Sequence, residues 1–170
     1  FDCPNLFAVP KIEKVVLNMG VTDPVDPKAR EKIMPILIKQ FEIIAGQKPV
    51  VTKAHQAISN FKLRKGDPLG VMVTLRGEYM WEFLDKLISL VLPRVKDFRG
   101  VSSSAFGCVL FSSLGIEEQI AFPEIDFDQI ERIRGLQVNL VISNSDHKKS
   151  FRLLELLGMP FEKEEIKGNK

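Results

Sequence analysis

The sequence has only two cysteines, Cys3 and Cys108, and only two histidines, His55 and His147. Two cysteines exclude a disulfide framework and a cysteine-rich zinc site, so a reducing compartment is the default. The histidines are isolated from each other, and no His, Cys and Asp residues cluster at the spacing of metal ligands. We therefore expect neither a metal site nor a cofactor.

Motifs of catalysis and nucleotide binding are also missing. Neither GxxxxGK[ST] nor GxGxxG occurs in the sequence. His147 follows Asp146 and has serines nearby, but adjacent residues do not make a catalytic triad, whose members must be brought together in space. The remaining basis for an enzyme would be a pair of carboxylates that the sequence does not reveal. We therefore expect no catalytic residues.

Long apolar runs are absent as well. The longest apolar segment, Leu84 to Leu92, is interrupted by Asp85, Lys86 and Ser89, so we expect no membrane span. Net charge is only +2, but residues 48–116 hold 10 basic and 5 acidic side chains, whereas residues 117–170 hold 8 and 11. This concentration of positive charge predicts a specific anionic partner.

Hydrophobic periodicity predicts an α+β domain. The length of 170 residues fits a single domain, 1–170. Alternation of apolar and polar residues predicts strands at 11–19, 50–53, 71–75 and 136–144, with a short one at 109–111. Helical spacing predicts helices at 28–44, 78–92 and 146–157. This order favours helices packed on one face of a mostly antiparallel, curved sheet.

Several local signals refine this outline. Asp26 and Pro27 form a helix start, and Pro35 should kink or break the helix that follows. Pro93 should stop the second helix, whose aromatic residues, Tyr79 and Trp81 included, we expect to pack in the core. The alternating acids of residues 124–128 predict a solvated strand face, and residues 129–133 predict a helical turn.

A long basic segment joins two of the predicted strands. It carries one acid, Asp67, and five basic or titratable side chains: Lys53, His55, Lys62, Arg64 and Lys65. Loops this long are usually functional or disordered, and phosphate is the natural partner for their charge. The alternative is a solvated loop whose lysines aid solubility. A second basic patch comprises Arg94, Lys96 and Arg99.

The predicted strands also share a polar face, opposite the apolar one. The residues on that face are Asn18, Thr74, Arg76, Gln137, Asn139 and Ser143, and all of them except Arg76 are neutral hydrogen-bonding groups. Such a face can read the sugars, phosphates and base edges of a folded RNA. The alternative is an open sheet face against water, which is common in antiparallel sheets.

Several motifs make the chain resemble a known family. LNMGV (17–21), GQKP (46–49), TLRGEYMWEF (74–83) and DFRG (97–100) are similar to the bacterial-type large-subunit ribosomal protein number five, which binds 5S rRNA. The resemblance covers about residues 5–161 and leaves 162–170 as a charged tail. It implies a structural role in the central protuberance of the large subunit, with contacts to large rRNA, neighbouring ribosomal proteins and a small-subunit head protein.

The resemblance also implies site residues. Asn18, Gln47 and Thr74 match positions that hydrogen-bond 5S rRNA, and Arg76 follows on the same face. Residues 53–69, which we call the arm, match a loop that reaches P-site tRNA. Its expected contacts are Lys53, His55, Asn60, Lys62, Arg64 and Lys65.

The chain departs from the family in ways that bear on its origin. Residues 22–35 are longer than usual, and the charged SFDGRGNYSLG of the family is SAFGCVLFSSLG here (104–115). His55 stands where a basic residue is expected, so its charge depends on pH. These departures predict an organellar ribosome, such as that of a mitochondrion, rather than a bacterial one. The rival function is a free RNA-binding regulator outside the ribosome.

Overall fold

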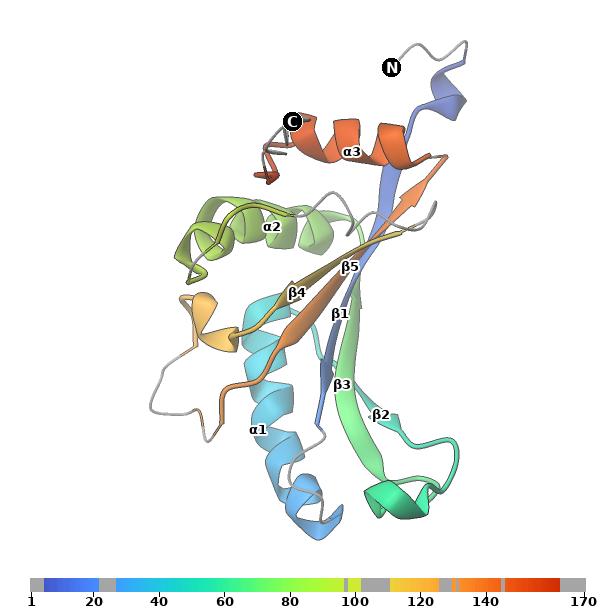
Figure 1. The fold of residues 1–170 in the computed structure, drawn as a ribbon, viewed down its shortest axis with the longest axis vertical. Coiled ribbons are helices and arrows are strands. Elements are labelled where there is room, and N and C mark those ends of the chain that lie inside the picture. Colours follow the sequence, from blue (N-terminus) through green and yellow to red (C-terminus); the bar gives the residue numbers. More distant parts are fainter. Residues whose placement is uncertain are drawn as a thin grey trace, which may run out of the picture.

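The computed structural model describes residues 5–21, 27–96, 98–101, 111–125, 130, 132–144 and 146–162. Five strands form one antiparallel sheet in the order β2-β3-β1-β5-β4 (Figure 1). They are β1 (Lys11–Gly20), β2 (Val50–Lys53), β3 (Pro68–Leu75), β4 (Phe111–Ile116) and β5 (Leu136–Ser143). The helices are α1 (Pro27–Ala45), α2 (Glu78–Lys86) and α3 (His147–Leu156). The predicted α+β class is confirmed.

The core lies on the helix-facing side of the sheet. Alternate side chains of β1, β3 and β5 point there and are at most 2% exposed; they include Val15, Leu17, Val73 and Leu140. A bulge at Glu13, between the paired residues Ile12 and Lys14, shifts the register of β1 against β5. Because the bulge adds one residue, Ile12 and Val15 both face the core although they are three positions apart.

The first helix continues through its proline. Of the two predicted effects of Pro35, a kink or a break, the break does not occur, since α1 runs without interruption from Pro27 to Ala45. Pro35 and Glu31, whose carbonyl loses its hydrogen bond to a helical N–H, are both exposed. Water can therefore satisfy that carbonyl, and the cost of the proline is reduced. The predicted cap Asp26 lies outside the described residues.

The second helix changes form along its length. α2 passes into a π-helical turn at Leu87–Val91 and then a 3-10 turn at Leu92–Arg94. The helical path therefore continues past Pro93, where the helix was predicted to stop. Leu87, Val91 and Leu92 stay buried through this change. The expected core positions of Tyr79 and Trp81 are wrong, because their side chains are 52% and 46% exposed. The ring of Tyr79 lies against the backbone of Gly46 at the end of α1.

The region before β5 differs from the prediction. The edge strand β4 begins at Phe111, where the predicted strand ends, and runs to Ile116. Glu124 and Ile125 lie in a turn instead of a strand, and Glu124 forms an ion pair of 2.8 Å with Lys86. Residues 130, 132 and 133 are not helical, so the predicted helical turn is wrong over its described part.

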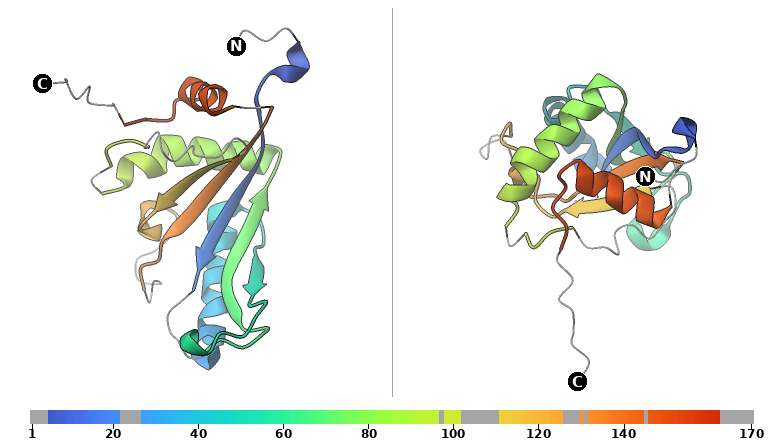
Figure 2. Two further views of the ribbon diagram at one scale, coloured as in Figure 1. Left: turned by 45° about the vertical axis from the view of Figure 1, so that its right-hand side comes forward. Right: turned by 90° about the horizontal axis from the view of Figure 1, so that it is seen from above.

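The helices leave one face of the sheet open. Figures 1 and 2 show α1 and α2 on the same side of the sheet, with α3 lying across one end of it. Leu154 of α3 is fully buried, and Gly158, with φ of +87°, ends that helix. Val101 and Phe161 form a parallel bridge that ties the segment after α3 to the segment after α2.

Two further observations concern the described residues alone. No helix among them is both long and apolar enough to cross a membrane. No three of their His, Cys, Asp and Glu side chains lie close enough together to hold a metal ion.

Candidate nucleic-acid interface

The open face of the sheet is organised in rows that cross the strands. In one row Val16 of β1 pairs with Thr74 of β3 and Asn139 of β5, and Asn139 pairs with Ser113 of β4. In the next row Asn18 pairs with Met72 and Gln137. Val50 of β2 and Gly115 of β4 extend that row to both edges. We call these two rows the open face.

The open face offers uncharged groups of two kinds. Asn18, Thr74 and Asn139 are half-buried, and Gln137 is exposed. The Nε2 of Gln137 donates a hydrogen bond of 3.0 Å to Oγ of Ser113, which fixes the orientation of its amide. Val16 and Met72 lie between these polar groups. The mixture suits ribose and base edges better than phosphate, which prefers cationic partners.

A hollow of about 380 Å³ lies at the β4 end of the open face. Its lining contains three glycines and two amides, with one carboxylate at the rim: Gly20, Gly115, Gly135, Asn18, Gln137 and Glu117. A Cβ atom added at Gly20 or Gly115 would meet no other atom within 4 Å. Backbone is thus accessible there, and a ligand can approach it closely.

The structure separates the predicted 5S rRNA contacts into two groups. Asn18 and Thr74 lie on neighbouring strands of the open face, as the alternation of polar and apolar residues in the sequence predicted. Arg76 is exposed one residue beyond β3, and Gln47 is exposed in the connection from α1 to β2. These two therefore lie at the margin of the open face. Sequence alternation gave no position for Gln47, because that residue is not in a strand.

The arm is an ordered extension of the β2–β3 hairpin. Near its base Ala54 N–H donates to the Asp67 carbonyl at 2.8 Å, and Gly66 N–H donates to the Ala54 carbonyl at 2.9 Å. Further out, Ile58 and Leu63 exchange backbone hydrogen bonds of 3.0 and 3.1 Å. A 3-10 turn, Ser59–Phe61, closes the tip. The backbone thus holds the arm as a narrow hairpin.

The side chains predicted as contacts of the arm are exposed to solvent. All six predicted contacts, Lys53, His55, Asn60, Lys62, Arg64 and Lys65, are exposed. Asp67 accepts a hydrogen bond of 2.8 Å from the backbone N–H of Arg64, so its carboxylate is engaged within the arm. Sequence reasoning missed Phe61, which is 65% exposed at the tip. An aromatic residue amid basic residues is the signal that could have identified it.

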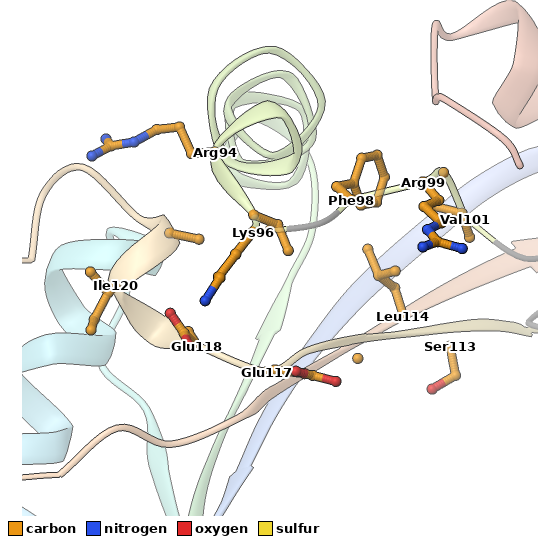
Figure 3. A pocket seen from close by; sticks show the side chains of 14 residues that line it. Arg94, Lys96, Phe98, Arg99, Val101, Ser113, Leu114, Glu117, Glu118 and Ile120 are labelled. Atoms are coloured by element: carbon orange, nitrogen blue, oxygen red, sulfur yellow. The ribbon is translucent and has the colours of Figure 1, made fainter.

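The second basic patch borders a cavity of about 800 Å³ along β4. Arg94, Lys96 and Arg99 line it together with Glu117 and Glu118. In Figure 3 the guanidinium groups of Arg94 and Arg99 lie at opposite ends of the view, and Lys96 extends toward the side where Glu118 lies. The three cations therefore do not converge, and carboxylates share their surroundings. Within the described residues this patch is less suited to phosphate than the arm is.

Comparison with known proteins covers most of the chain. The family profile described as "Ribosomal protein L5" matches residues 5–64, and the profile for the C-terminus of the same ribosomal protein family matches residues 68–161. The large ribosomal subunit protein uL5 of Thermoanaerobacter sp. (strain X514) is 50% identical over 163 residues, which cover 96% of this chain and 89% of that protein. The protein of the same name from Pediococcus pentosaceus (strain ATCC 25745 / CCUG 21536 / LMG 10740 / 183-1w) is 51% identical with the same coverage.

Proposed function

The chain belongs to the ribosomal protein L5 family and is a structural constituent of the large ribosomal subunit, and we propose that it binds 5S rRNA through its open face. Membership of a ribosomal protein family confirms the expectation that the chain is not an enzyme. Both matched segments supply strands to one sheet, since β3 lies between β2 and β1. This interleaving supports a single domain.

The observation that carries the proposal is the composition of the open face. Its amides, hydroxyls and apolar side chains lie in register on adjacent strands, and no described helix covers them. RNA helices present ribose hydroxyls and base edges in a wide, shallow minor groove, which a broad polar surface can follow. Asn18 and Thr74 are the central hydrogen-bonding residues of this contact, and Gln47 and Arg76 extend it at the margin.

The arm supplies a second RNA contact. Its exposed cations, held on an ordered hairpin that projects from the sheet (Figure 1), suit phosphates of an RNA at some distance from the open face. We assign P-site tRNA to the arm. The mixed-charge cavity at Arg94, Lys96 and Arg99 is assigned to large-subunit rRNA and to neighbouring ribosomal proteins, a small-subunit head protein among them.

The place of the protein is the large subunit of a ribosome. The similar proteins named above come from bacteria. The organellar origin predicted from the departures at 22–35 and 104–115 receives no support from these relatives. Residues 102–110, which hold most of the second departure, lie outside the described residues.

Binding to a 5S rRNA transcript tests the proposal. The double variant Asn18→Ala/Thr74→Ala should bind more weakly, by about 1 to 3 kcal/mol for each buried hydrogen bond that is removed. Glu42→Ala, an exposed substitution on α1, is the matched control and should leave affinity unchanged. Unchanged affinity of the double variant would remove Asn18 and Thr74 from the contact.

Sedimentation separates the ribosomal role from the rival. A constituent of the large subunit travels with that subunit through a sucrose gradient at moderate salt. A free regulator remains at the top, and this result would overturn the ribosomal role and the proposed contacts with it.

A further inference from the structure

Phe61 is an exposed aromatic residue in an ordered position. It is 65% exposed, and it ends the 3-10 turn at the tip of the arm. The turn is held on both sides, by the Ile58–Leu63 backbone pair and by the Lys62 N–H, which donates to the Ser59 carbonyl at 3.0 Å. Lys62 adopts φ of +49°, a conformation that costs a non-glycine residue energy. The fold thus fixes the backbone position of a side chain that the described residues leave mostly exposed.

The exposed sequence neighbours of this ring are mostly polar and cationic, and Ile58, 45% exposed, is the large apolar exception. Asn60, Lys62, Arg64 and Lys65 are all exposed within four positions of it. Desolvating several cations disfavours an apolar protein partner at this point. A nucleobase has an apolar face for the ring and carries phosphates nearby for the cations, so RNA matches both features.

We infer that Phe61 is a stacking residue, which packs its ring on a nucleobase exposed at the surface of the RNA bound by the arm. This inference rests on the proposed contact between the arm and tRNA. Stacking and phosphate contacts are both tolerant of sequence, because every base has a π-face and every nucleotide a phosphate. A contact of this kind accepts different tRNAs equally, as a component that meets each tRNA in turn must.

Affinity measurements on the full chain test the stacking. Fluorescein-labelled deacylated tRNA serves as the probe, and anisotropy gives Kd at several salt concentrations. Phe61→Ala should raise Kd by about 5- to 150-fold, the usual effect of removing one stacked base, with the salt slope unchanged. Phe61→Trp should bind at least as tightly as the original chain. Phe61→Leu keeps apolar area without the ring and should bind nearly as weakly as Phe61→Ala.

Fluorescence supplies a readout that local destabilisation would not mimic. Trp81 is the single tryptophan of the sequence, so Phe61→Trp/Trp81→Phe places one tryptophan at the tip. Stacking on a base should quench its emission when tRNA is added. The control Ile58→Trp/Trp81→Phe puts the reporter in the same arm at a position that is 45% exposed, and it should be quenched far less.

The outcomes distinguish the inference from the function on which it rests. If the unaltered chain binds tRNA but Phe61→Ala binds equally well, the stacking role is overturned and the arm contact stands. If Phe61→Leu binds as tightly as the original chain, the ring packs against an apolar surface. The inference that its partner is a nucleobase is then overturned. If the unaltered chain binds no tRNA at all, the proposed arm contact itself fails.

Discussion

The open face and the arm adjoin each other in the fold but differ in chemistry. The two rows of the open face contain amides, hydroxyls and apolar groups, held in register by the strand pairing of the sheet. The arm presents cations on a hairpin held by a few backbone hydrogen bonds. The two surfaces meet along β3, which carries Thr74 at one end and continues into the arm at the other.

This difference is the basis for proposing two different modes of RNA binding on one small protein. Contacts between neutral groups and ribose or base edges depend little on salt, whereas contacts to phosphate release counterions and weaken as salt rises. The open face therefore suits an RNA that stays bound. The arm suits an RNA that binds and leaves.

The largest effect is expected where the two surfaces join. Gly70 of β3 pairs with Thr52 of β2 and Gly20 of β1, and an added Cβ would clash with the backbone carbonyl oxygen of Met19. Because that neighbour is backbone, Gly70→Ala should destabilise the chain by about 1 to 3 kcal/mol or more. Thermal melting should show a fall in Tm of about 2 to 4 °C per kcal/mol.

Gly20→Ala is the matched control for this change. Gly20 is the direct partner of Gly70, yet an added Cβ there meets nothing within 4 Å. Its Tm should stay close to that of the original chain. Equal Tm values for the two variants would show that no neighbouring backbone lies close to the Cβ position of Gly70.

The next effect concerns the open face alone. Gly115→Val places a side chain in the hollow beside Asn18 and Gln137, at a position where an added Cβ meets no other atom within 4 Å. Melting should be unchanged, since valine also suits a strand. Binding of 5S rRNA should weaken by about 1 to 3 kcal/mol, because the side chain excludes the RNA and costs about one hydrogen bond or more. Unaltered binding would place the RNA elsewhere on the sheet.

A smaller effect is expected from the arm charges. Lys62→Gly/Arg64→Ala/Lys65→Ala removes three exposed cations, and glycine preserves the positive φ at position 62 that alanine would strain. The salt slope of tRNA binding should fall by about 0.7 to 0.9 for each phosphate that is no longer neutralised. The same variant should bind 5S rRNA with an unchanged slope, which is the internal control. An equal fall in salt slope for both RNAs would contradict the proposal that the arm and the open face bind different RNAs.

The smallest effect should come from the mixed-charge cavity. Glu117→Gln/Glu118→Gln removes the carboxylates that share this cavity with Arg94, Lys96 and Arg99. Binding to large-subunit rRNA should strengthen slightly and depend more on salt, because the cations then act without opposing charge. An unchanged slope would mean that these carboxylates lie away from the bound RNA.

Local patterning allowed much of the open face to be predicted. Alternation in β1, β3 and β5 gave the correct face for Asn18, Thr74 and Gln137, because a strand buried on one side imposes a period of two. The edge strand β4 was misplaced since its sequence, FSSLGI, alternates weakly. Its pairing with β5 is a contact between distant residues, which no local window contains.

Side-chain exposure was harder to predict than secondary structure. Tyr79 and Trp81 lie in a real helix, but helical spacing alone could not show how much of the helix the sheet covers. The bulge at Glu13 is another feature of tertiary pairing, which changes the side on which Ile12 lies. Gln47 and Phe61 lie outside strands, so their positions on the surface depend on turn geometry that periodicity does not report.

The order of strands in the sheet has a consequence for synthesis. β1, at the centre of the sheet, leaves the ribosome before either of its partners, β3 and β5. Ser143 hydrogen-bonds the Lys11 carbonyl across 132 positions of sequence. β3 is complete at residue 75 and can pair with one edge of β1 early, but the other edge of β1 has no partner until β5, Leu136–Ser143, has emerged. Closure of the sheet is therefore a late event. A protein that serves the ribosome thus depends on its own translation reaching β5 before its core is complete.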